Sequence, residues 1–395
     1  MLAGVGLLFV ALDYRSRDPD STLYTELAAS LVDRPVPEWI APRWVNYVGD
    51  EDLFREHPAG LFWPPALLAR LGYPPDQSAY LVNAVYQVLS ILLFGALAAR
   101  FVPAGEARAL MWLLTLLPVA FVFRIRANHE QAVLVCTLAA AYATDRARLH
   151  SAWHLLTTAS LGGLFLVKGV LVLPGLAVCA WLLAVRELET GGRLLRDWRS
   201  WGGLLGGAAA VAALVVAYEA WYRAFTGGES FLGFYLPRQM GASFDPAASG
   251  GFNPLNVPGY AARVVWFAFP WSLAAGVAAW RVRGALPAFV RGRSREGAGG
   301  AGIAGLVFAL GAAAVYVLVF GLSDRIAERY IFPAYFFAGG AGVVAAIRGW
   351  PRLRALVERL DVYHPWVPAL VWVSTIVLRT ATLWLPRVGV HVADG

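Results

Sequence analysis

Long apolar runs separated by short polar segments dominate this chain from end to end. Most runs approach the roughly 20 residues that cross a bilayer as a helix, because lipid-facing backbone must satisfy its hydrogen bonds internally. The first run is shorter and would extend only about 18 Å as a helix. The pattern predicts an all-α polytopic membrane protein with about eleven spans. The predicted spans are 1–12, 79–99, 107–123, 129–145, 152–167, 170–185, 203–221, 259–280, 302–320, 329–347 and 366–384.

Composition indicates one membrane-embedded unit. Hydrophobic residues make up 58% of the 395 residues and charged residues 15%, whereas a soluble domain carries roughly 25% charged residues. No internal repeat or separate soluble domain is visible, so residues 1–395 are interpreted as a single domain. The net charge of +7 comes from arginines scattered through loops, which argues against a nucleic-acid partner. Cys136 and Cys179 fall in apolar spans, so no disulfide framework is expected.

Arginine in the short connections predicts the orientation of the bundle. By the positive-inside rule, the arginine-rich connections face the cytoplasm. These connections are 100–108, 146–150, 186–201, 281–300 and 348–361. The long first loop, 13–78, is acidic and rich in proline and tryptophan, and a second long loop covers 222–258. Both loops are predicted to face outward, the second as a mobile segment that suits substrate entry.

The first loop opens with the signal of a helix. Asp18 stands before a proline, as an N-cap does before the first helical position. An apolar stripe at helical spacing then predicts a short amphipathic helix on the outer membrane face; it consists of Leu23, Leu27 and Leu31. Asp20 is not needed as the cap. It either compensates the helix dipole or serves as a general base at the membrane surface.

Further polar side chains gather at the ends of spans on the same outward side. They are His57 in FREHPAGLFWPP, Arg126, His129 and Glu130 in FRIRANHEQAV, Arg238 in the second loop, and Arg325 and Arg329 in SDRIAERYIFPAY. Arginines near a helix N-terminus bind phosphate, although snorkelling to lipid headgroups and pairing with carboxylates remain alternatives. An acid, several cations and an adjacent apolar surface on one side suit a lipid-linked phosphate whose chain stays in the bilayer.

Lys168 is the only lysine in the chain, and it stands within the apolar sequence LGGLFLVKGVLVLPG. All other basic residues are arginine. By the predicted topology, Lys168 ends the fifth span on the outward side, before a glycine at which the backbone can turn. An ionisable residue inside such a run is a functional candidate, and snorkelling is the alternative.

Four segments resemble the motifs of a known family. They are DSTLYTELA (20–28), EHPAGLFWPP (56–65), LVKGVLVLPG (166–175) and ERYIFPAYFFAG (328–339). In order and spacing they resemble the polyprenyl-phosphate-sugar-dependent membrane glycosyltransferases of family 39 and their aminoarabinose-transferase relatives. These enzymes have the GT-C superfold, and the resemblance runs from about residue 13 to 350.

The resemblance implies roles for individual residues. Asp20 matches the catalytic carboxylate, and Lys168 matches a lysine near the donor phosphate. The other matches are Tyr24 in the tyrosine helix, His57 at a His-or-Lys position, and Arg329 with Tyr330 in the Arg-Tyr motif. The chain departs from the family at three places: Ser21 follows the aspartate, Val170 replaces a proline, and residues 128–130 replace an aspartate.

These features predict a GT-C-like inverting glycosyltransferase with a polyprenyl-phosphate sugar donor and a lipid, glycan or protein acceptor. It would act on a hydroxyl or amine at the outer face of the inner (plasma) membrane. A transporter or flippase for anionic lipid-linked substrates is the alternative, and envelope enzymes that use lipid diphosphates remain open. No cofactor or firm metal site is predicted, although four residues are of types that hold a divalent cation: Asp20, His57, His129 and Glu130.

Overall fold

The computed structural model describes residues 18–44, 53–114, 117, 126–191, 195–241, 253–291, 298–322 and 328–362. Regular structure in these residues is helical, apart from one isolated bridge between Arg43 and Leu53. Five helical segments are long and apolar enough to cross a membrane: Pro75–Ala98, Trp153–Glu189, Trp198–Phe225, Gly302–Gly321 and Arg329–Gly349. The predicted all-α polytopic fold is confirmed. The predicted spans 1–12 and 366–384, and most of 115–125, lie outside the described residues.

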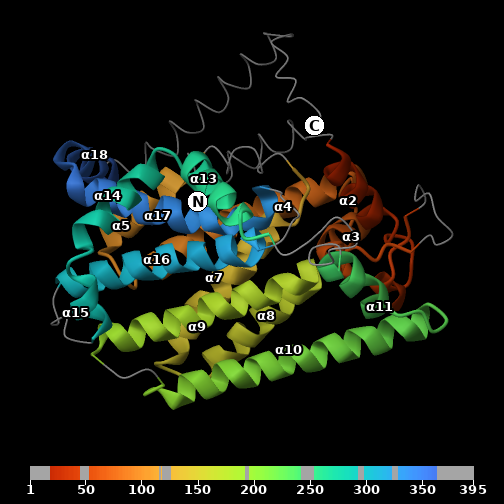
Figure 1. Cartoon of the computed structure of the whole chain (residues 1–395). Helices are drawn as coiled ribbons and strands as arrows, with labels where there is room; N and C mark the ends of the chain where they lie inside the picture. The colour runs from red at the N-terminus through yellow and green to blue at the C-terminus, as the bar shows by residue number, and fades with distance from the viewer. Residues whose placement is uncertain are drawn as a thin grey trace, which may run out of the picture.

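The short helices of the first loop gather at one end of the bundle, here called the first-loop end, together with α11 (Figure 1). They are α2 (Pro19–Ala29), η1 (Val36–Ile40), η2 (Ala59–Leu61) and α3 (Trp63–Arg70), and α11 is Phe231–Leu236. The α2 helix begins where predicted, because Asp18 accepts a hydrogen bond from the Ser21 N–H as its N-cap. Its buried face includes Tyr24 and Leu27 and packs on α3 and α4, so protein covers much of the predicted membrane-facing stripe.

Long helices run between the first-loop end and the opposite end, which carries α15 and α18 (Figure 1). The helices from α4 to α10 are α4 (Pro75–Ala98), α5 (Ala104–Leu114), α7 (Glu130–Ala147), α8 (Trp153–Lys168), α9 (Val172–Glu189) and α10 (Trp198–Phe225). The later ones are α13 (Asn256–Phe267), α14 (Trp271–Val282), α15 (Leu286–Val290), α16 (Ala298–Gly321), α17 (Phe332–Gly349) and α18 (Pro351–Val362). Short turns are η3 (Gly169–Leu171), η4 (Pro237–Gly241) and η6 (Glu328–Ile331).

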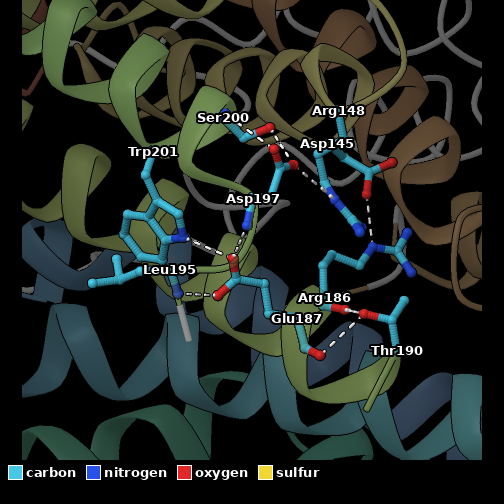
Figure 2. Close-up of polar contacts among 9 residues, drawn as sticks. All are labelled: Asp145, Arg148, Arg186, Glu187, Thr190, Leu195, Asp197, Ser200 and Trp201. Atoms are coloured by element: carbon cyan, nitrogen blue, oxygen red, sulfur yellow. Dashed lines mark hydrogen bonds and ion pairs between the residues drawn. The ribbon is translucent and has the colours of Figure 1, made fainter. Parts of the chain in front are cut away.

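The chain reverses between α8 and α9, as the two separate predicted spans require. Buried Asp145, in the last turn of α7, accepts a hydrogen bond from Arg186 Nε at 2.7 Å near the end of α9 (Figure 2). The α8 helix begins shortly after α7 ends, so the start of α8 and the end of α9 lie at the same end of the bundle. The apolar stretch Trp153–Glu189 therefore forms two antiparallel helices, joined at Gly169.

A second polar contact fixes the connection from α9 to α10 at the opposite end. The buried Glu187 carboxylate accepts hydrogen bonds from the N–H groups of Leu195 and Asp197, at 2.7 and 2.9 Å (Figure 2). It also accepts the Trp201 indole N–H at 3.1 Å. A buried carboxylate with three donors is compensated, so this cluster holds the loop and leaves no unsatisfied acceptor for a ligand.

The predicted span 259–280 is not one continuous helix, because α13 and α14 meet at an angle of 113°. Pro270 precedes α14, and a proline within a helical run removes a backbone donor and clashes with the preceding turn. The break leaves α14 packed along α17, where the Trp271 carbonyl lies so close to Gly342 that any side chain there would overlap it.

Candidate functional site

Asp20 and Arg329 form an ion pair at the first-loop end. Asp20 lies in the first turn of α2, and Arg329 belongs to η6, just before α17. Their side chains are 32% and 30% exposed, so both can meet a ligand from outside the protein. Asp18 has a different role: its carboxylate accepts a hydrogen bond from the Ser21 hydroxyl at 2.6 Å and caps α2. Of the two aspartates, Asp18 therefore serves as the cap, as predicted, and Asp20 faces Arg329.

Lys168 ends α8 and donates a hydrogen bond from Nζ to His57 Nε2 at 2.6 Å. Its side chain is only 6% exposed, so it does not snorkel to lipid headgroups. An ammonium has no lone pair, so His57 must accept through Nε2 and carry its own proton on Nδ1. The α8 helix ends at Lys168, as predicted, and this end lies at the site beside His57 of the first loop.

Burial keeps the His57 imidazole neutral. The ring is enclosed by protein, and burial lowers the His57 pKa well below its usual range, with the Lys168 ammonium lowering it further. The first-loop ring of Phe54 packs edge-on against it, at 6.0 Å between centroids. Because the His57 ring is neutral, it accepts the hydrogen bond without compensating the positive charge of Lys168.

The Gly169 turn is specified by a tyrosine from the second loop. Gly169 has φ +54°, and a Cβ on it would lie 2.2 Å from the Tyr235 hydroxyl oxygen. That hydroxyl donates to the Lys168 carbonyl at 3.0 Å and accepts from the Val170 N–H at 2.9 Å. Tyr235 therefore satisfies the backbone groups that the interrupted helix leaves open.

A compact group of rings connects the two halves of the site. The Tyr24 hydroxyl lies 3.4 Å from His129 Nδ1, and the His57 and His129 rings are 5.5 Å apart between centroids. Glu130 is the first residue of α7, as predicted, and His129 Nε2 approaches its carboxylate at 3.5 Å. Within the described residues, neither Glu130 oxygen has a hydrogen-bond partner although the side chain is buried. Lys168 and Arg126 are the cations that attract this carboxylate.

Hydrogen bonds attach the segment before α7 to α2 and α4. The Ser21 hydroxyl accepts the Ala127 N–H at 3.0 Å, and Asn83 donates to the Arg126 carbonyl at 2.6 Å. The Arg126 guanidinium lies 3.9 Å from the Asp18 carboxylate. These contacts orient the predicted Arg126–Glu130 cluster toward the first loop.

Arg238 reaches the site indirectly. It pairs with Glu56, the residue before His57, and the neighbouring Gln239 donates to the Glu56 carbonyl at 3.0 Å. Arg55 pairs with Glu229 at 2.7 Å and lies over the Phe234 ring. The part of the predicted mobile loop that is described therefore includes α11 and η4, both held against the segment that carries His57.

The structure brings together nearly all the predicted site residues. Asp20 pairs with Arg329, Tyr330 follows in η6 and stacks on Phe320, and the Tyr24, His57, His129, Glu130 and Lys168 side chains are contiguous. Arg325 lies outside the described residues. The sequence analysis missed Tyr235, Tyr218 and Asn83. Tyr218 accepts the Ala59 N–H at 2.9 Å beside His57, and the only sequence signal was a polar residue within an apolar span.

No group of three or more histidine, cysteine or acidic side chains in the described residues is arranged to hold a metal ion. Glu130 contacts His129, but the Lys168 ammonium occupies the nearest acceptor of His57. The described site brings the cations Lys168, Arg126 and Arg329 near the carboxylates of Asp20 and Glu130, and its cations suit an anionic substrate.

Comparisons with known proteins agree with this arrangement. A family model described as dolichyl-phosphate-mannose-protein mannosyltransferase matches residues 56–222, the segment that contains His57, Glu130 and Lys168. Two crystal structures of ArnT from Cupriavidus metallidurans share the fold. The predicted resemblance to GT-C membrane glycosyltransferases is confirmed. No curated protein matches the chain in a sequence search.

The two ArnT structures differ in ligand and coverage. The apo form matches with a TM-score of 0.60 and 18% identity, over 88% of this chain and 60% of ArnT. The form bound to undecaprenyl phosphate matches with a TM-score of 0.60 and 18% identity, over 95% of this chain and 68% of ArnT. At this identity the likeness is one of fold. This chain spans 60% of the length of apo ArnT in that match.

Proposed function

We propose that this chain is an integral membrane glycosyltransferase that moves a sugar from a polyprenyl-phosphate donor to an acceptor hydroxyl or amine. The convergence of the Asp20–Arg329 pair and the Lys168–His57 pair at one end of an apolar bundle carries the proposal. The mannosyltransferase family match supports it. The undecaprenyl phosphate bound to ArnT supports a polyprenyl-phosphate donor.

In the proposed reaction, the acceptor oxygen or nitrogen attacks C1 of the sugar while the bond between C1 and the phosphate oxygen breaks. The acceptor proton passes to Asp20, and the phosphate leaves with the electron pair of the broken bond. Arg329 and Lys168 supply fixed positive charge where the leaving phosphate gains negative charge. A single displacement inverts the configuration at C1.

The Asp20–Arg329 pair suggests how the base becomes available. A carboxylate held by a guanidinium is a weaker proton acceptor, because the cation favours its charged form. A phosphate is a strong bidentate partner for arginine, so a bound donor competes for Arg329. We propose that donor binding transfers Arg329 from Asp20 to the phosphate. Asp20 would then gain basicity only when the donor is in place, which couples proton abstraction to donor occupancy.

We propose that the first-loop end faces the periplasm or cell exterior and that the chain resides in the inner (plasma) membrane. Arginine-rich connections lie at the opposite end, as the positive-inside rule requires for a cytoplasmic side. The acceptor would be a lipid, glycan or protein exposed at the outer face. Its hydroxyl or amine would approach the partly exposed Asp20.

The test is turnover by the purified full chain with radiolabelled polyprenyl-phosphate sugars and a membrane extract as acceptor. Asp20→Asn is expected to lower turnover by roughly 10²–10⁴, the usual loss when a general base is removed. Asp18→Asn is the matched control, because asparagine caps a helix about as well as aspartate. Near wild-type turnover in Asp20→Asn would assign Asp20 to helix electrostatics. Transbilayer movement of labelled lipid without any sugar transfer would favour a transporter.

A further inference from the structure

An apolar groove lies in the half of the bundle remote from the candidate site. It encloses about 540 Å³ between α14 and α16, with α17 as its floor and the ends of α4 and α5 beside it. Both α14 and α16 pack closely along α17 but touch each other only slightly, which leaves the groove between them. Pockets of roughly 300–1,000 Å³ with mostly apolar walls are typical of ligand sites.

Two arginines stand at one end of the groove. Arg281 of α14 reaches across to the end of α17 near Gly349, and Arg348 of α17 bonds Glu106 through Nε at 2.8 Å. Within the described residues, Arg281 forms no ion pair. Two guanidinium groups against one carboxylate leave net positive charge where the apolar walls end.

Exposed tryptophans beside the two arginines indicate the depth at which this end of the groove lies in the membrane. Trp280 and Trp350 are 67% and 58% exposed; Trp280 precedes Arg281 in sequence, and Trp350 itself lines the groove. Exposed tryptophans concentrate at the level of lipid headgroups. The groove therefore combines a wall at acyl-chain depth with cations at headgroup depth.

We propose that this groove binds an acidic phospholipid, with its phosphate at Arg281 and Arg348 and one acyl chain between α14 and α16. Basic pockets between transmembrane helices bind anionic lipid headgroups by the same combination of charge and apolar surface. The site is separate from the proposed donor site. The α17 helix has 18 residues and spans about 27 Å between η6, which carries Arg329, and Arg348.

The test is native mass spectrometry of the purified full chain with added phosphatidylglycerol or phosphatidylcholine. The wild type is expected to retain phosphatidylglycerol in preference to phosphatidylcholine. One cation near the surface changes the affinity for an acidic lipid about five-fold, so Arg281→Gln should reduce that preference by about this factor. Arg283→Gln is the matched control, because Arg283 stacks over Trp280 at 3.3 Å and does not line the groove.

A second variant separates a lipid from a free anion. Ala345→Trp fills the apolar part of the groove and keeps both arginines. It should lower the retention of phosphatidylglycerol, whereas a site that binds only the phosphate would be unaffected. Thermal unfolding of each variant identifies a general loss of structure. Equal retention of the two lipids, equal effects of Arg281→Gln and Arg283→Gln, or unchanged retention in Ala345→Trp would overturn the proposal. The first result would also be expected if another part of the chain or a second copy covered the groove.

Discussion

Lys168 shows at the scale of one residue why a chain rich in arginine keeps a single lysine. Its ammonium is buried and donates to the neutral His57 Nε2, and the rings of Tyr24, Phe54 and His129 surround that histidine. A guanidinium is planar, larger and presents five donors in a fixed fork, so it differs in shape from the compact ammonium that this enclosed position holds. An arginine here would have to displace the rings around His57 to place its fork, so we expect the substitution to disturb the site.

Lys168→Arg is accordingly expected to impair sugar transfer although it preserves the charge. Lys168→Ala should lower kcat/KM for the donor by roughly 10–100-fold, because a hydrogen bond to a charged group contributes about 1.5–3 kcal/mol. The loss should appear mainly as a higher KM for the donor, since the ground-state phosphate is already charged. Arg148→Lys, at the opposite end, is the control. Unchanged kinetics in Lys168→Arg would place the donor phosphate at Arg126 and Arg329.

His57 gives a pH dependence whose sign follows from its lowered pKa. The unfolded chain protonates this imidazole near pH 6.5, whereas the folded protein resists protonation because of burial and Lys168. The unfolded state therefore binds more protons, so the His57 contribution to stability is present above about pH 6.5 and is lost as the pH falls. Thermal midpoints measured from pH 7.5 to 5.5 should decline less in His57→Gln than in the wild type. An identical decline would mean that His57 is protonated in the folded protein.

At the scale of elements, local signals predicted where helices begin and end. The Asp18 cap of α2, Glu130 at the start of α7 and the break after Lys168 were all predicted, because each depends on a few adjacent residues. Contacts between distant segments were not predictable in this way. The Tyr235 hydroxyl that completes the Gly169 turn comes from a different loop, and nothing near Gly169 in the sequence indicates it.

The Gly169 turn can be tested against a glycine that lacks the tyrosine contact. Gly169→Ala combines a positive φ with overlap on Tyr235, whereas Gly227→Ala has φ +72° and open space around it. Backbone strain of this kind costs roughly 1–3 kcal/mol. The thermal midpoint of Gly169→Ala should therefore fall further than that of Gly227→Ala, with loss of transfer activity in Gly169→Ala alone. Equal effects of the two substitutions would show that Tyr235 simply moves aside.

At the scale of the whole molecule, hydropathy predicted the fold class because a bilayer leaves few alternatives to helices. The ion pair across the site could not be predicted from the sequence. Asp20 and Arg329 lie at opposite ends of the described chain, and only the folded bundle brings them together. The bend before Pro270 was also missed, because the run 259–280 is mostly apolar and proline is tolerated within membrane helices.

The orientation of the bundle decides which side of the membrane supplies the acceptor, and two matched leucines can test it. Leu71 is 78% exposed after α3 at the first-loop end, and Leu149 is 67% exposed between α7 and α8 at the opposite end. In intact cells, Leu71→Cys should react with a membrane-impermeant thiol reagent. Leu149→Cys should react only after permeabilisation if the arginine-rich end faces the cytoplasm, as the positive-inside rule predicts.

The protein without introduced cysteines is the negative control for this labelling. Cys179 is buried and Cys136 only partly accessible, and burial raises the barrier to reagent access at both. If Leu149→Cys were labelled in intact cells and Leu71→Cys were not, the bundle would have the opposite orientation. The Asp20–Arg329 pair would then face the cytoplasm, where the acceptor would have to be a cytoplasmic molecule. The expected labelling would instead support the proposal that the Asp20–Arg329 pair faces the outer side, where an acceptor exposed at the outer face could approach Asp20.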